Sequence, residues 1–275
     1  MNIRQMTRES WMAARGSLAA FPHLRALSDV EAFCLFVGFA RSGHSLVGQM
    51  LDAHPDAVVA QELDALAYLR HPRHVLYGLL IHRARRFASS GATWTGYTYA
   101  IPGQWQGRFR AIKVIGDKKG GKTTVRLADD PDLLAQLRAR VGVPVKIVLV
   151  TRDPFDNIAT LARKNGGDFD QALRHYEVRC EVIERLQAEA GKDLLHLRHE
   201  DLVADPQQEL SRLCDLFDLE PYPDYLEACA SIVLDSPRRT SRGVEWPPDV
   251  REAVGDLVTR FSFLHGYEQP ASAAP

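Results

Sequence analysis

The sequence predicts an α/β fold with three layers and a mainly parallel central sheet. Short apolar runs alternate along the chain with segments of helical periodicity, an order typical of such folds. The apolar runs are mostly continuous, with few polar residues between, and this pattern favours strands covered on both faces. We therefore expect helices to pack against both faces of the sheet.

The expected strands coincide with the apolar runs, which are residues 32–37, 58–60, 112–115, 145–150 and 194–197. The helices between them carry local start signals. Asp153-Pro154 is typical of an N-cap followed by a first helical position, and Asp205-Pro206 opens another helix. A further helix is expected around residues 173–183, where apolar residues recur at helical spacing.

The length of 275 residues is consistent with a single domain over residues 1–275. Residues 71–107 interrupt the alternation of strands and helices. Their first part predicts a helix with a basic side, and a glycine- and aromatic-rich stretch with Trp94, Tyr97, Tyr99 and Trp105 follows. This segment is interpreted either as an insertion that covers a binding pocket or as a solvated helix with a small aromatic cluster.

The composition, with 45% hydrophobic and 25% charged residues, argues against disorder and against a disulfide scaffold. The net charge of -1 argues against a protein that coats nucleic acid or an anionic membrane, so any anion site must be local. Residues 1–15 contain no apolar run of the length of a signal-peptide core, and no segment reaches the length of a membrane helix. The cysteines lack CxxC spacing, which favours buried thiols in a reducing cytoplasm.

The most informative stretch is a glycine-rich loop between a predicted strand and a predicted helix, residues 38–45. Its spacing is that of G-x-x-x-x-G-K-[ST], and such a loop directs backbone N–H groups and a helix N-terminus toward a phosphate. His44 replaces the lysine that bridges nucleoside triphosphates, whereas Arg41 adds a charge inside the loop. The loop therefore suits a phosphate-like group whose reaction needs no metal; the alternative is a glycine turn with an exposed arginine.

A second candidate anion site follows the strand at residues 145–150. Arg152 stands where a strand ends and a helix begins, which is the usual ligand edge of an open α/β sheet. Thr160 lies eight residues later, about two helical turns away. The two side chains could bind one phosphate; alternatively, Arg152 pairs with a local carboxylate such as Asp156.

With both motifs present, the chain resembles the sulfotransferases that use 3′-phosphoadenylyl sulfate (PAPS). Residues 41–45 resemble their R-S-G-T-T phosphosulfate loop, and residues 152–156 with Thr160 resemble their R-D-P-x-D motif with its later serine. Residues 51–56 followed by Glu62 resemble a segment of the bacterial and tyrosylprotein-type members. The resemblance covers roughly residues 30–220 and implies the P-loop NTPase-like sulfotransferase fold.

The late segments also resemble the family, with three departures. Residues 116–118 resemble its G-D-K segment and residues 199–206 resemble its Y-E-D-L-x-x-D-P stretch. His44 stands in place of a small hydroxyl residue, Lys119-Gly120 in place of [ST]-P, and His199 in place of a common tyrosine. The first two departures touch the donor site.

The resemblance also implies roles for individual residues. Glu62 is the expected base, with a pKa raised by desolvation, and His44 and His54 are alternatives. His54 precedes Pro55 at a predicted helix end, which favours a capping residue over a base. Lys118 is a candidate cation at the transferring group, although its position alone, in the basic run of residues 118–122, favours a surface lysine. The implied catalytic residues are Glu62, Lys118, Arg41 and His44. The implied donor-binding residues are Arg41, Ser42, Gly43, His44, Ser45, Arg152 and Thr160, with Arg239 and Arg242 from a late basic loop at residues 236–243.

The function implied by the resemblance is transfer of a sulfuryl group from PAPS to a hydroxyl or amine acceptor. The product would be adenosine 3′,5′-bisphosphate (PAP), and no metal would be required. Two alternatives remain: an atypical P-loop nucleotide kinase or NTPase, and a non-catalytic nucleotide-binding protein of the same fold. The acceptor could be a small molecule, carbohydrate, lipid or peptide, and no nucleic-acid partner or membrane span is expected. The sequence does not indicate the oligomeric state.

Overall fold

A five-stranded sheet forms the centre of the computed structural model, which describes residues 3–94, 96–234 and 239–267. All of its neighbouring strands run parallel, in the order β2-β5-β1-β6-β7. The predicted α/β fold class is thereby confirmed. The strands are β1 (Ala32–Gly38), β2 (Ala57–Gln61), β5 (Val114–Lys118), β6 (Val145–Thr151) and β7 (Leu194–Arg198).

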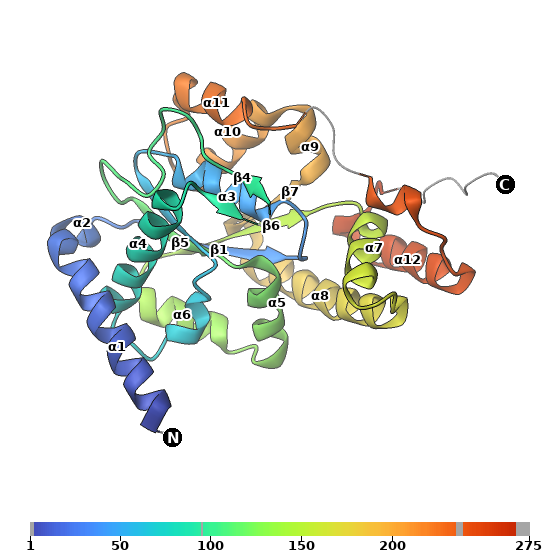
Figure 1. The fold of residues 1–275 in the computed structure, drawn as a ribbon, viewed down its shortest axis with the longest axis horizontal. Coiled ribbons are helices and arrows are strands. Elements are labelled where there is room, and N and C mark those ends of the chain that lie inside the picture. The colour runs from blue at the N-terminus through green and yellow to red at the C-terminus, as the bar shows by residue number, and fades with distance from the viewer. Residues whose placement is uncertain (1–2, 95, 235–238, 268–275) are drawn as a thin grey trace.

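Helices pack on both faces of this sheet (Figure 1). One hydrophobic cluster joins the sheet to α4, α5, α6, α8 and α12, and a second joins its other face to α3, α10 and α11. The helices are α1 (Ile3–Ala20), α2 (Leu24–Ser28), α3 (His44–Asp52), α4 (Arg73–Ser89), α5 (Gly120–Asp129), α6 (Leu133–Val141), α7 (Pro154–Lys164), α8 (Phe169–Ala190), α9 (His199–Ala204), α10 (Pro206–Leu216), α11 (Pro223–Ala230) and α12 (Pro248–Arg260). Short elements complete the chain: the β3 (Thr93–Trp94) and β4 (Tyr97–Thr98) hairpin and five 3-10 turns, η1 (Phe21–His23), η2 (Ala65–Tyr68), η3 (Gly191–Asp193), η4 (Thr240–Gly243) and η5 (Ser262–Leu264).

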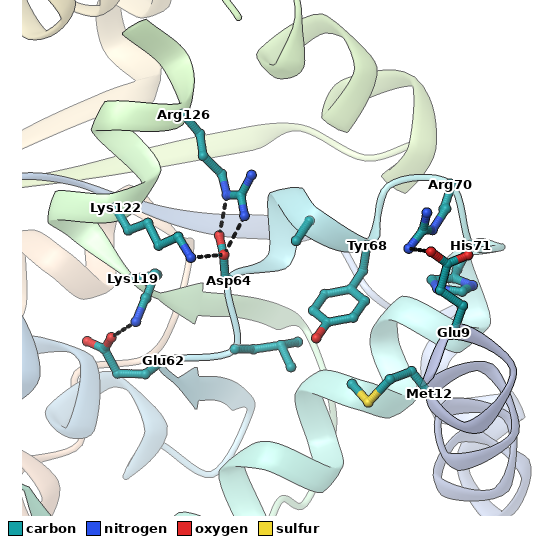
Figure 2. Close-up of a pocket in the computed structure, with 12 residues that line it drawn as sticks. Glu9, Met12, Glu62, Asp64, Tyr68, Arg70, His71, Lys119, Lys122 and Arg126 are labelled. Carbon is teal, nitrogen blue, oxygen red and sulfur yellow. Dashed lines mark hydrogen bonds and ion pairs between the residues drawn. The ribbon is translucent and has the colours of Figure 1, made fainter. Parts of the chain in front are cut away.

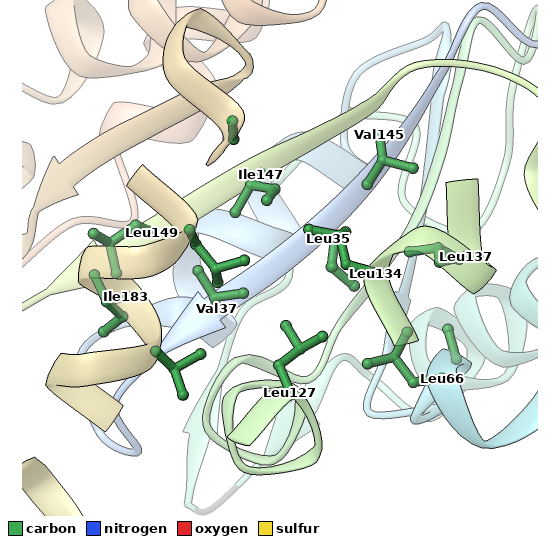
Figure 3. Close-up of a cluster of buried hydrophobic side chains, with 14 of the residues drawn as sticks. Leu35, Val37, Leu66, Leu127, Leu134, Leu137, Val145, Ile147, Leu149 and Ile183 are labelled. Carbon is green, nitrogen blue, oxygen red and sulfur yellow. The ribbon is translucent and has the colours of Figure 1, made fainter. Parts of the chain in front are cut away.

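The continuous apolar run of β1 reflects burial on both faces. Leu35 and Val37 point into one cluster, whereas Cys34 and Phe36 belong to the other. Figure 3 shows the first cluster, in which Leu35 and Val37 lie among side chains of the covering helices. The four cysteines are free and buried, as expected for structural thiols. Among the described residues, no helix is both long and apolar enough to cross a membrane.

The third strand differs from the expected 112–115. β5 begins at Val114 and continues through Gly116, Asp117 and Lys118, which are all buried. A Cβ on Gly116 would lie 2.2 Å from the Cys34 carbonyl oxygen, so a glycine allows the close approach to β1. Hydrophobicity did not reveal this part of the strand because two of its buried residues are charged.

The segment at residues 71–107 is not an insertion throughout. Its helix, α4, packs against β2 and α1 and buries Leu76, Leu80 and Ile81, so the predicted solvated or lid-like helix is wrong. Only the later part, which contains the β3–β4 hairpin, lies beside the cavity described below. The basic residues Arg83, Arg85 and Arg86 near the end of α4 suggested a solvated helix, but the apolar run before them is buried.

The helix α1 was not predicted, because its sequence is polar and mixed in charge. It crosses α4 at two glycines, where a Cβ on Gly78 would lie only 1.9 Å from the Gly16 carbonyl oxygen. The backbones of the two helices are thus in direct contact.

Replacing Gly78 by alanine should lower the free energy of unfolding by about 1–3 kcal/mol, because the added methyl group forces the two helices apart. This loss should exceed the gain of roughly 1 kcal/mol from better helix propensity. Urea denaturation measures the difference. Arg86→Ala, at an exposed site on the same helix, should change the free energy by no more than about 0.5 kcal/mol. Equal stability of the Gly78 variant and the unmodified protein would contradict the close crossing.

Candidate functional site

The carboxyl ends of the parallel strands open onto one cavity of about 680 Å³. After β1 the chain forms strands on one side of it, β2 and β5, and then on the other, β6 and β7. Such a change of direction creates a crevice at the strand ends, where α/β proteins bind ligands. The loops that follow β1, β5, β6 and β7 all contribute to the cavity wall.

The loop after β1 adopts the conformation expected of a phosphate loop. Gly38 and Gly43 have φ values of 127° and 95°, and α3 begins directly after Gly43. Arg41 also has a positive φ, 74°, which is strained for a residue with a side chain. Arg41, Gly43, His44 and Ser45 of the predicted loop line the cavity.

Ser42, by contrast, is fully buried below the loop. Its hydroxyl accepts a hydrogen bond of 3.1 Å from the Asn157 amide of α7. The same amide group lies 3.4 Å from the carbonyl oxygen of Arg152. Asn157, which the sequence analysis missed, therefore ties the phosphate loop to the second anion site. Ser42 is thus enclosed as a whole and, although it was expected to bind the donor, it is not among the residues that line the cavity.

His44 turns back toward its own loop. Its Nε2 lies 3.0 Å from the Val37 carbonyl oxygen, and the side chain is nearly inaccessible. Burial, reinforced by the charge of Lys118, lowers the pKa of His44 to about 4, so the imidazole is neutral at pH 7. A neutral ring cannot replace the cation of a nucleoside-triphosphate loop.

Lys118, the last residue of β5, places an ammonium group beside the phosphate loop. It is only 2% exposed, so its interpretation as a surface lysine is wrong. Its ammonium group donates hydrogen bonds to the Ser45 hydroxyl at 2.9 Å and to Glu62 Oε1 at 2.5 Å. A Cβ on Gly48 would lie 2.6 Å from the Lys118 stem, so the glycine of α3 makes room for the lysine.

Glu62 follows β2 in a strained turn with a φ of 62°. The buried Asp117 carboxylate holds this turn by accepting hydrogen bonds from the next three backbone N–H groups, at 2.7–3.0 Å. Asp117 was not predicted as a site residue. Its effect is to fix the carboxylate of Glu62 beside the cavity.

The expected raised pKa of Glu62 is wrong. Burial does act to raise this pKa, but the charges and hydrogen bonds of Lys118 and Lys119 outweigh it and lower the pKa below its ordinary value. Figure 2 shows Glu62 paired with Lys119. The carboxylate is thus ionised, as a base must be, and is held by two ammonium groups.

His54, the other alternative base, is a structural residue. Its ring is fully buried, with Nε2 2.9 Å from the Glu220 carbonyl oxygen and Nδ1 accepting a hydrogen bond from the Asp56 backbone. It does not line the cavity. Its interpretation as a base is therefore wrong.

At the second anion site, the alternative arrangement, in which Arg152 pairs with Asp156, is present. The guanidinium donates to Asp156 at 3.0 Å, and Arg152 still lines the cavity. Its buried Nε has no hydrogen-bond partner among the described residues. Thr160 donates to the Asp156 carbonyl oxygen at 2.8 Å and lies 3.1 Å from the Thr240 hydroxyl, so its hydroxyl is already engaged.

The late basic loop, residues 236–243, packs against α7, the helix that carries Asp156 and Thr160, through its described residues. The Ser241 N–H donates to the Asp156 carboxylate at 2.7 Å, which anchors η4 on α7. Arg239 and Arg242 are exposed beside this contact and are absent from the cavity wall. Residues 236–238 of the predicted loop lie outside the described residues.

The cavity wall is strongly cationic. Two further cations that the sequence analysis missed, Lys164 of α7 and Arg179 of α8, reach the wall from outside the motifs. Glu62 is the only carboxylate among the described residues that line it. The cationic residues of the wall are Arg41, Lys118, Lys119, Lys122, Arg152, Lys164 and Arg179. No group of His, Cys, Asp or Glu residues within the described ranges has the arrangement of a metal site.

Two of the departures from the family pattern contact each other. A Cβ on Gly120 would lie 2.6 Å from His44 Nε2, so the histidine ring fits because residue 120 is glycine. Their coupling gives a test by a double-mutant cycle.

Gly120→Ala should displace the His44 ring from Val37 and reduce stability, whereas the same change beside His44→Thr should cost little. The coupling free energy should be about 1–2 kcal/mol, within the range of residues in contact. Urea denaturation of the two single variants, the double variant and the unmodified protein measures it. Additive effects would show that the two residues do not interact.

Comparison with known proteins gives a consistent result. A family model described as the sulfotransferase family matches residues 144–224, which contain β6, Arg152 and β7. No match was found among curated protein sequences.

The structure is similar to that of the sulfotransferase domain from the curacin biosynthetic pathway, with a TM-score of 0.58, 15% identity and coverage of 88% of this chain and 99% of that one. The sulfotransferase domain of the Synechococcus PCC 7002 olefin synthase matches with a TM-score of 0.53, 17% identity and coverage of 88% and 96%. Sulfotransferase STF9 from Mycobacterium avium matches with a TM-score of 0.51, 11% identity and coverage of 95% of this chain and 86% of that one. The chain thus has the P-loop-like sulfotransferase fold, and its residues 144–224 match the sulfotransferase family.

Proposed function

We propose that this protein transfers a sulfuryl group from PAPS to a hydroxyl or amine acceptor and releases PAP. One observation carries the proposal: Lys118 joins the phosphate loop to Glu62 through hydrogen bonds to Ser45 and the carboxylate. Arg41 and Lys118 provide positive charge where the donor phosphate would bind, and Glu62 lies beside them as a base for the acceptor. The neutral His44 disfavours the alternative of a kinase or NTPase.

The two anion sites suit the two phosphates of the donor. The 5′-phosphosulfate would bind at the loop, where backbone N–H groups and the N-terminus of α3 favour an anion. The 3′-phosphate would bind near Arg152, whose Nε is free of other partners in the described structure. Thr160, Arg239 and Arg242 lie on that side, on α7 and the loop anchored to it.

In the proposed reaction, the acceptor oxygen forms a bond to sulfur while the bond from sulfur to the donor phosphate oxygen breaks. The electron pair of the broken bond stays on the phosphate, so negative charge develops there. Lys118 and the loop N–H groups are placed to stabilise that charge. Glu62 takes the proton of the acceptor. For this, the Lys118 ammonium group gives up its hydrogen bond to Glu62 and donates to the donor phosphate oxygen instead.

The acceptor would lie on the Glu62 side of the cavity. Trp94, Tyr97 and Tyr99 line it together with the apolar segment at residues 232–234. We propose that the strands β3 and β4 cover the acceptor, which could be a small molecule, carbohydrate, lipid or peptide. Trp105 is not part of this wall and lies beside Arg108 instead.

Other finer points are proposed on the sequence alone. Residues 1–275 form a single domain. The motif of residues 51–56 with Glu62 suggests the bacterial and tyrosylprotein-like branch. The free thiols suit a reducing, cytoplasmic location.

A thermal-shift titration with PAP in the absence of magnesium tests the proposal. PAP at 100 times its dissociation constant should stabilise the protein by about 2.7 kcal/mol. Arg152→Ala should weaken this stabilisation, because the variant removes a phosphate contact. Stabilisation by magnesium-ATP and not by PAP would overturn the proposal in favour of the kinase or NTPase.

A further inference from the structure

His199 lies between the two anion sites. It follows β7 directly, and since Thr151 pairs with Arg198 across the sheet, His199 and Arg152 stand side by side at the strand ends. Its ring also contacts the phosphate loop, because a Cβ on Gly43 would lie 2.7 Å from His199 Nδ1. The same ring lines the cavity.

The Nδ1 atom of His199 is buried and has no hydrogen-bond partner among the described residues. A buried polar atom without a partner costs stability, so such atoms are rare unless a ligand or water completes them. Here the atom lies against the loop that binds the proposed donor. His199 therefore has an unsatisfied nitrogen on the side of the phosphate loop and also lines the cavity between the two anion sites.

Burial and the charges around His199 favour the neutral form of its ring. Burial and the facing Arg152 guanidinium lower the pKa of His199, and Glu200 and Asp156 only partly oppose them. Glu200 accepts hydrogen bonds from the Asp153 backbone and Tyr267, so its carboxylate is directed toward other groups. A phosphate dianion at this place would reverse the local balance of charge.

We infer that His199 is a further donor-binding residue, which takes up one proton from solvent as PAPS or PAP binds and then donates a hydrogen bond to a donor phosphate oxygen. This inference rests on the proposed function. It goes beyond it because a histidine, unlike the tyrosine common in the family, couples donor binding to pH.

The sign of the pH dependence follows from the uptake of a proton. Where the ring is neutral in the free protein and charged in the complex, affinity for PAP rises as pH falls, by up to about tenfold per pH unit for one linked proton. The range from pH 8.5 to 6.5 is the useful one, because the second ionisation of a phosphate, near pH 6, affects lower values.

Isothermal titration calorimetry with PAP tests the inference. Titrations at one pH in two buffers of different ionisation enthalpy measure the protons taken up, and a series from pH 8.5 to 6.5 measures the affinity. His199→Gln should weaken binding, abolish most of the uptake and flatten the pH series. His74→Gln, at an exposed histidine of α4, should behave like the unmodified protein.

Equal proton uptake by the unmodified protein and His199→Gln would overturn the inference, as would PAP binding without uptake in the unmodified protein. If His199→Gln does not fold, His199→Tyr provides the same comparison with a ring that stays neutral over this range. Failure of the unmodified protein to bind PAP at any pH would instead overturn the proposed function. The two failures are thus distinguishable.

Discussion

Replacing Lys118 by methionine should reduce the rate of sulfuryl transfer by about 10²–10³-fold, the cost of losing one preorganised charge at a reacting oxygen. Methionine can occupy the space that Gly48 leaves for the lysine stem, so the main change is the loss of the ammonium group. The pKa of Glu62 should rise in this variant, because Lys118 is among the groups that lower it. Single-turnover kinetics with labelled PAPS measures the rate.

Lys192→Met is the matched control, since Lys192 is exposed and far from the cavity wall. It should transfer the sulfuryl group at the rate of the unmodified protein. PAP affinity should change less than the rate in Lys118→Met, because the phosphate loop and Arg152 remain. An unchanged rate in Lys118→Met would contradict the role given to the buried lysine.

Glu62→Gln should reduce transfer by about 10²–10⁴-fold, the usual contribution of a general base. PAP binding should persist and become tighter, because the change removes a negative charge that Lys118 and Lys119 now neutralise. Transfer assays and calorimetry on the same protein separate the two effects. Glu31→Gln, at an exposed site before β1, serves as control.

A Glu62→Gln protein that keeps its full rate would show that another group accepts the proton. His44 would then be the remaining histidine candidate, since His54 lies outside the cavity wall. Loss of transfer with PAP binding retained would also exclude the non-catalytic alternative.

The strands that were predicted well are those whose residues are apolar on both faces. The runs at β1 and β6 gave nearly correct bounds because their residues, apart from the half-buried Lys146, are buried against one helical layer or the other. The charged end of β5 was not predicted as part of the strand. Asp117 and Lys118 are buried with hydrogen-bond partners, and charged residues leave no hydrophobic pattern in the sequence. The helix α1 was not predicted because it packs on α4 through glycine contacts, which give no hydrophobic pattern.

The same distinction applies to the site. The convergence of Arg41 and Arg152 could be predicted, because parallel strands carry their following loops to one edge. The roles of Asn157 and Asp117 could not, because each bonds to a segment more than 50 residues away. The state of Glu62 also depends on such contacts, and its lowered pKa follows from lysines whose distance the sequence does not give.

The contact between His44 and Gly120 makes these two positions interdependent. A Cβ at position 120 would lie 2.6 Å from His44 Nε2, so a larger residue there requires the imidazole to move. Moving the ring breaks its contact with the Val37 carbonyl oxygen, so the loop after β1 must change with it. Positions 44 and 120 therefore have to be redesigned together in any attempt to alter this loop.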